Sequence, residues 1–130
     1  MKTRNLYVVD DDKIYHFLLK NLLKQNNINV NSTFFANGYD AIQFLTENNE
    51  DQEILPDIIL LDVNMPIMNG WQFLEDYTKL KGTLSKDPVI YMISSSNNEV
   101  DINKAGEFTG IVKEYFLKPI CKEDLDKIFV

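Results

Sequence analysis

Aspartates follow two apolar runs that lie far apart in the chain. Residues 6–9 (Leu-Tyr-Val-Val) lead into aspartates 10–12, and residues 58–61 (Ile-Ile-Leu-Leu) lead into Asp62. Open α/β sheets bind ligands beyond the carboxyl ends of their strands, so acids in these positions would meet at one edge. Carboxylate oxygens gathered there would suit a hard divalent cation. The sequence therefore predicts an acidic, cation-binding pocket.

A hydroxyl group and a lysine stand after two later apolar runs. Ser94 opens a run of three serines after one of them, and Lys118 stands directly before Pro119 after the other. A bound cation can locally reverse the charge of an acidic pocket, which then accepts anions. Acids, one hydroxyl and one lysine in such a pocket indicate phosphate chemistry.

Apolar runs alternate with amphipathic stretches along the chain, and the periodicity of each predicts its secondary structure. We expect strands at residues 6–9, 29–35, 57–61, 88–93 and 113–117. We expect helices at residues 13–25, after the Asn37-Gly38 turn, from about Trp71 to Leu80, at residues 97–108 and at residues 122–129. Five strands alternating with five helices predict an α/β fold with a doubly wound parallel sheet, covered on both faces.

The helical stretches also predict which side chains face the core. In residues 13–25, Ile14, Phe17, Leu18 and Leu22 recur at helical spacing, so this stripe is expected to face the sheet. Asp12 precedes that helix and is interpreted as its N-cap, not as a metal ligand.

Composition limits the classes of function. The 130 residues predict one domain, 1–130, and the net charge of −7 argues against direct binding to nucleic acid. The one cysteine excludes an internal disulfide and fits a reducing compartment. No signal peptide is evident, and no apolar stretch approaches the roughly 20 residues that cross a bilayer. We therefore expect a cytoplasmic protein with no membrane contact.

Four short motifs resemble those of one family. They are residues 8–12 (Val-Val-Asp-Asp-Asp), 61–70 (Leu-Asp-Val-Asn-Met-Pro-Ile-Met-Asn-Gly), 92–95 (Met-Ile-Ser-Ser) and 115–119 (Tyr-Phe-Leu-Lys-Pro). In this order and spacing the whole chain resembles the CheY-like receiver domain of response regulators in two-component signalling. The resemblance implies a flavodoxin-like (βα)5 sandwich with strand order 2-1-3-4-5.

The resemblance also implies the roles of the candidate site residues. Asp62 would be the phosphoacceptor, whose carboxylate oxygen forms an acyl phosphate. Asp11, Asp62 and the backbone carbonyl of Asn64 would hold Mg²⁺, with Asp10 contributing directly or through water. Lys118 would pair with a phosphate oxygen.

The remaining implied roles concern the switch and the partners. Ser94 would hydrogen-bond the attached phosphate, and Tyr115 would reorient with it, changing the surface of the fourth helix, fifth strand and fifth helix. The donor would be a sensor histidine kinase or a phosphotransfer protein, and the output a downstream protein. The domain would act as a signalling module that catalyses only its own phosphorylation and dephosphorylation, either as a single-domain regulator or as part of a longer one.

Other readings of the same residues stay open. Asp10 and Asp11 could form a solvated turn, Lys118 could be a surface lysine, and Tyr115 could be a partly buried aromatic with no switching role. The rival functions are an Mg²⁺-dependent phosphohydrolase with an aspartate nucleophile and a phosphate-independent interaction domain. Such hydrolases place a second aspartate two residues after the nucleophile, where this chain has Asn64.

Overall fold

Strands and helices alternate from one end of the chain to the other. The computed structural model describes residues 3–65, 68–95, 99–108 and 110–129. The elements in chain order are β1 (Arg4–Val9), α1 (Lys13–Gln25), β2 (Val30–Phe35), α2 (Gly38–Glu47), β3 (Ile58–Asp62), α3 (Gly70–Leu80), the 3-10 turn η1 (Lys81–Thr83), β4 (Val89–Ser94), α4 (Glu99–Gly106), β5 (Val112–Leu117) and α5 (Lys122–Ile128).

The five strands form one parallel sheet in the order β2-β1-β3-β4-β5. The central strand β3 is Ile-Ile-Leu-Leu-Asp, and all five of its residues are buried. A strand this apolar is stable only where both sheet faces are covered. The predicted flavodoxin-like fold and its strand order are confirmed.

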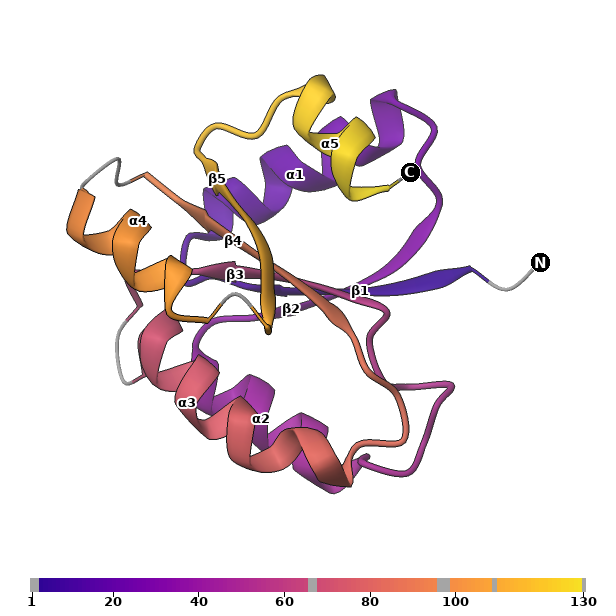
Figure 1. Cartoon of the computed structure of the whole chain (residues 1–130). Helices are drawn as coiled ribbons and strands as arrows, with labels where there is room; N and C mark the ends of the chain where they lie inside the picture. Colours follow the sequence, from indigo (N-terminus) through magenta and orange to yellow (C-terminus); the bar gives the residue numbers. More distant parts are fainter. Residues whose placement is uncertain (1–2, 66–67, 96–98, 109, 130) are drawn as a thin grey trace.

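Helices cover both faces of the sheet (Figure 1). One core cluster joins the sheet to α2, α3 and α4 and includes Leu45, Leu74 and Ala105. The other joins the opposite face to α1 and α5 and includes Leu19 and Leu125. The site at the carboxyl edge therefore rests on two packed layers.

Side-chain caps fix where three of the helices begin. The Asp12 carboxylate accepts hydrogen bonds from the N–H groups of Ile14 and Tyr15, at 3.0 and 3.2 Å, as the sequence predicted. Asn37 caps α2, and Asn69 forms a reciprocal capping box with Gln72 at α3. These caps satisfy N–H groups that have no partner inside the helix.

The predicted core face of the first helix is wrong at three of its four positions, and the fourth, Leu22, is partly buried and packs against the core. Ile14, Phe17 and Leu18 are 72%, 63% and 57% exposed, whereas Leu19 and Leu23 are buried. The helix carries two overlapping apolar stripes. The exposed stripe ends at Asn21, one turn after Phe17 and Leu18, so it cannot cover the sheet along the whole helix.

The remaining elements match the predicted ones to within a few residues. Trp71, Leu74 and Tyr77 form the buried face of α3, as expected. Of the helix predicted at residues 97–108, α4 covers Glu99–Gly106, and residues 97 and 98 lie outside the described part. Within the described residues, no helix has the length and apolar character needed to span a bilayer.

Candidate functional site

The carboxyl ends of four strands carry the predicted site residues. Asp10 follows β1 directly, Asp62 and Ser94 end β3 and β4, and Lys118 follows β5. Strand register keeps them at one edge, because Asp62 pairs with Ile93 and Ser94 pairs with Leu117. Residues that are far apart in the sequence thus meet at one edge.

Three carboxylates form a tight acidic cluster at this edge. One oxygen from each of Asp10, Asp11 and Asp62 lies within 4.8 Å of the other two. Asp10 and Asp62 are 2% and 6% exposed, while Asp11 faces solvent. Burial, with the charges of Asp10 and Asp11, raises the pKa of Asp62 to about 6 against the opposing pull of Lys118. Such a cluster suits a hard cation with oxygen ligands, because the cation would relieve this repulsion.

Lys118 supplies the positive charge of the cluster. Its Nζ lies 2.7 Å from Oδ2 of Asp10 and 3.6 Å from Oδ1 of Asp62. Burial by itself would lower the pKa of Lys118, but its hydrogen bond to Asp10 and the charges of Asp10 and Asp62 raise it overall. The ammonium group therefore stays charged, and the lysine predicted in the acidic pocket lies beside Asp10 and Asp62. The Lys118-Pro119 peptide bond is cis.

Ser94 and Tyr115 lie on neighbouring strands and interact. The Ser94 side chain is fully buried, and its carbonyl accepts the N–H of Lys118 at 2.8 Å. Burial raises the pKa of Tyr115, while its side-chain hydrogen bond with Ser94 opposes that rise. The two residues predicted to switch together are thus hydrogen-bonded to each other.

Gly70 lets α3 begin directly against the end of β3. Its N–H donates to the carbonyl of Val63 at 2.8 Å, and a Cβ at this position would lie 2.5 Å from the carbonyl oxygen of Asp62. Only a residue without a side chain fits such a close approach. Asn64, in the loop between these elements, is exposed, and residues 66 and 67 of the same motif lie outside the described part.

Sequence reasoning missed Tyr15. Its ring lies below the Lys118 ammonium, with Nζ 4.4 Å from the ring centroid. The predicted stripe of α1 turned Ile14 inward and left Tyr15 unassigned. The stripe formed by positions 15, 19, 22 and 23 is the available signal, because it continues along the helix.

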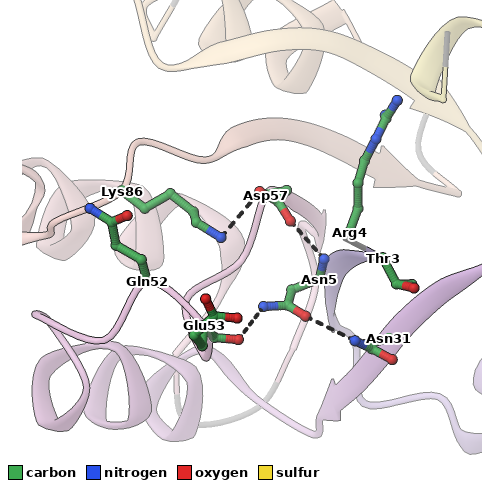
Figure 2. A pocket seen from close by; sticks show the side chains of 8 residues that line it. All are labelled: Thr3, Arg4, Asn5, Asn31, Gln52, Glu53, Asp57 and Lys86. Atoms are coloured by element: carbon green, nitrogen blue, oxygen red, sulfur yellow. Dashed lines mark hydrogen bonds and ion pairs between the residues drawn. The ribbon is translucent and has the colours of Figure 1, made fainter. Parts of the chain in front are cut away.

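A hollow lies at the opposite edge of the sheet (Figure 2). It measures about 440 Å³ and is lined by Thr3, Arg4, Asn5, Asn31, Gln52, Glu53, Asp57 and Lys86. Asp57 accepts the N–H of Asn5 at 2.7 Å and pairs with Lys86 at 3.2 Å. Asn5 in turn donates to the carbonyls of Glu53 and Leu55. Here polar groups bind one another and join β1 to the segment that precedes β3.

Comparison with known proteins agrees with this geometry. The sequence model of the response regulator receiver domain matches residues 6–129, so the chain belongs to that family. Response regulator Rcp1 of Synechocystis is 30% identical over 124 residues, covering 95% of this chain and 82% of Rcp1. A crystal structure of the Mn(2+)-bound form of Rcp1 superposes with a TM-score of 0.74 at 26% identity, covering 96% of this chain and 88% of that one.

Two further relatives extend the comparison. A two-component response regulator from Cytophaga hutchinsonii superposes with a TM-score of 0.85 at 26% identity, covering 98% of this chain and 96% of that one. Regulator of RpoS from Escherichia coli is 27% identical over 125 residues, which are 96% of this chain. This chain spans only 32% of the length of that relative.

Proposed function

We propose that this receiver domain accepts a phosphoryl group on Asp62 from a phosphohistidine of a sensor kinase or phosphotransfer protein. The observation that carries the proposal is the meeting of Asp10, Asp11, Asp62 and Lys118 at one sheet edge, with oxygens within 4.8 Å and an ammonium group 2.7 Å from Asp10. We expect the domain to work in the cytoplasm, where it would meet such donors.

The transfer needs one nucleophilic oxygen at Asp62. That oxygen forms a bond to phosphorus while the bond from phosphorus to the histidine nitrogen breaks, and the nitrogen keeps the electron pair. The carboxylate must be ionised to attack, and Lys118, 3.6 Å from Oδ1, favours that state. Lys118 is also close enough to offer an N–H to an oxygen of the arriving group.

The acidic cluster fits Mg²⁺. Asp11 and Asp62 would hold it together with the backbone carbonyl of Asn64, and Asp10 would contribute directly or through water. Both Asp10 oxygens already accept hydrogen bonds, one from the Asp12 N–H and one from Lys118. Bound Mg²⁺ would offset the negative charge of the transferring phosphoryl oxygens. The Mn(2+)-bound form of Rcp1 supports a divalent-cation site in a relative of this chain.

The output would be a change of the α4-β5-α5 face. Ser94 has a single hydroxyl proton, so an attached phosphate can compete with Tyr115 for its hydrogen bonding. Losing that partner would bias Tyr115 towards another arrangement, which is a population shift driven by phosphate contacts. Val100, Ile102 and Leu117 expose 70%, 43% and 45% of their surfaces on this face, where a protein target would bind.

We propose that the chain does not turn over a separate substrate. Asn64, an exposed amide, stands where a phosphohydrolase of the rival class would need a general acid. Water would instead remove the phosphoryl group from Asp62 and reset the domain.

The test is incubation with acetyl phosphate and Mg²⁺, followed by intact-mass measurement. We expect the wild-type chain to gain one acid-stable, base-labile phosphoryl group. Asp62→Asn and addition of EDTA should each abolish this gain, and the matched variant Asp57→Asn should retain it. A wild-type chain that takes no phosphate, or an Asp62→Asn variant that takes it, would contradict the proposal.

A further inference from the structure

Tyr15 forms an aromatic wall beside Lys118. It lies in the first turn of α1, and the Lys118 Nζ stands 4.4 Å from the centroid of its ring. Tyr15 packs against the core cluster that joins α1 and α5 to the sheet, and this packing restrains the ring. An ammonium group within about 6 Å of an aromatic centroid is attracted to the ring face.

The contacts of Lys118 define what the ring does. The ammonium group has three N–H groups on a flexible four-carbon stem. It donates to Asp10 at 2.7 Å, while Asp62 lies farther away, at 3.6 Å. Because the side chain of Lys118 is only 18% exposed, the ring and the two acids leave it little room to swing into solvent. The ring therefore confines the ammonium group next to the acceptor carboxylate.

The ring, not the hydroxyl, makes this contact. The Tyr15 hydroxyl is buried and has no hydrogen-bond partner among the described residues. Burial, together with the charges of Asp10, Asp62 and Asp124, raises the pKa of Tyr15 above its usual range. The phenol is therefore neutral and cannot pair with Lys118 as an anion.

We propose that Tyr15 is a positioning residue for phosphoryl transfer, whose ring holds the Lys118 ammonium group between Asp10 and the place beside Asp62 where a phosphoryl oxygen arrives. This inference rests on the proposed function, because it assigns Lys118 to the phosphoryl group. Tyr15 acts through Lys118 and needs no contact with the phosphodonor.

The first experiment compares Tyr15→Leu with Tyr15→Phe. Leucine removes the π face and keeps an apolar side chain, whereas phenylalanine removes only the hydroxyl. At saturating Mg²⁺ we expect Tyr15→Leu to lower the rate constant of phosphorylation by acetyl phosphate by about 3- to 10-fold. Tyr15→Phe should keep the wild-type rate constant. The dissociation constant for Mg²⁺ should be unchanged in both. Tyr15→Met replaces the leucine variant if that variant does not fold.

A double-mutant cycle separates positioning from general damage. In a Lys118→Met background, Tyr15→Leu should cause no further loss of rate, because the group that the ring holds is absent. The same loss in both backgrounds, or a loss in Tyr15→Phe equal to that in Tyr15→Leu, would overturn the proposal.

A second measurement is independent of phosphorylation. Acetylation with an N-hydroxysuccinimide ester, read by peptide mass spectrometry, reports how freely Lys118 reaches solvent. Relative to Lys86 in the same molecule, we expect Tyr15→Leu to raise the acetylation rate of Lys118 at least about threefold and Tyr15→Phe to leave it unchanged. An unchanged ratio in Tyr15→Leu would overturn the proposal. A chain that takes no phosphate but shows the expected ratio would overturn the proposed function, and the confinement of Lys118 by the Tyr15 ring would still stand.

Discussion

The two edges of the sheet each carry a lysine beside an aspartate, and the two pairs have different surroundings. At the carboxyl edge, Lys118 is 2.7 Å from the buried Asp10, and the carboxylates of Asp11 and Asp62 share the same space. At the amino edge, Lys86 is 3.2 Å from Asp57, whose side chain is 35% exposed. The carboxyl edge therefore gathers three acids and one lysine, whereas the pair at the amino edge has one acid for one lysine.

Asp57 and Asp62 show the same contrast. Asp57 also accepts the N–H of Asn5 (Figure 2). Lys86 also donates to the carbonyl of Leu55 at 3.2 Å, so each partner has a second bond. Burial and the charge of Asp10, in contrast, raise the pKa of Asp62 to about 6. An excess of buried negative charge is costly for folding and useful for binding a cation. The difference indicates chemistry at one edge and structural support at the other.

The largest expected effect comes from removing Lys118, and removing Lys86 is the comparison. Lys118→Met leaves buried carboxylates without their partner, so we expect a loss of about 3 kcal/mol of stability and about a 100-fold slower phosphorylation. Lys86→Met removes a partly exposed pair and should cost less than about 1 kcal/mol, with an unchanged rate. Urea denaturation and acetyl phosphate kinetics measure both. Equal losses in the two variants would show that the edges do not differ as described.

The second comparison uses one glycine near each end of α3. Gly70→Ala places a Cβ 2.5 Å from the Asp62 carbonyl oxygen, and should lower the free energy of unfolding by about 2–3 kcal/mol through overpacking. Gly82→Ala meets nothing within 4 Å and should change the free energy of unfolding by less than about 0.5 kcal/mol. Thermal and urea denaturation provide the measurement. A stable Gly70→Ala variant would mean that α3 can move away from β3 without cost.

The third prediction concerns pH in the presence of EDTA. The folded chain binds the Asp62 proton with a pKa of about 6, against an ordinary value of 3.8, so ionising this group opposes folding. The penalty is absent below about pH 4, grows as the pH rises to about 6 and is then constant. Asp62→Asn should therefore stabilise the fold by about 1–2 kcal/mol at pH 7.5 and by almost nothing at pH 3.5.

Asp57→Asn is the matched control for that titration. Its amide cannot form the ion pair with Lys86, so the variant should be less stable than wild type at pH 7.5. Urea denaturation curves at several pH values compare the two variants. If Asp62→Asn is destabilising at pH 7.5, the acidic cluster does not carry the unfavourable charge that the structure indicates.

The smallest expected effect lies in the hollow at the amino edge. Asn5→Ala removes three hydrogen bonds, and this should cost about 1 kcal/mol of stability. The Asn5 amide donates to the carbonyls of Glu53 at 2.8 Å and Leu55 at 3.0 Å, and it accepts from the Asn31 amide at 3.4 Å. The phosphorylation rate should stay at the wild-type value. A slower rate in a fully folded Asn5→Ala protein would mean that the two edges are coupled through the sheet.

The strand ends were predictable because a buried strand leaves a strong local pattern. The apolar runs before Asp10 and Asp62, and those before Ser94 and Lys118, set both the sheet and the edge that these residues share. The Asp12 cap was also predictable, since its partners Ile14 and Tyr15 lie two and three residues away. Interactions between residues a few positions apart can be predicted because they depend little on how the rest of the chain packs.

The buried face of α1 was not predictable in the same way. Its sequence offers two apolar stripes, and only the packing of α1 against the sheet and α5 selects Leu19 and Leu23 over Phe17 and Leu18. That choice also turns Tyr15 towards Lys118, a contact between residues more than a hundred positions apart. Helical periodicity is a property of one segment and cannot tell which stripe its neighbours will cover.

By itself, then, the sequence determined the five-stranded parallel sheet and the acids, hydroxyl and lysine at its carboxyl edge, because local periodicity and strand-end position decide both. Only the tertiary structure decided that Asp10 would take the shorter contact with Lys118, that Ser94 would bond Tyr115 and that Tyr15 would lie against the ammonium group. Those contacts depend on how separate elements pack in three dimensions, and no single stretch of the chain holds that information.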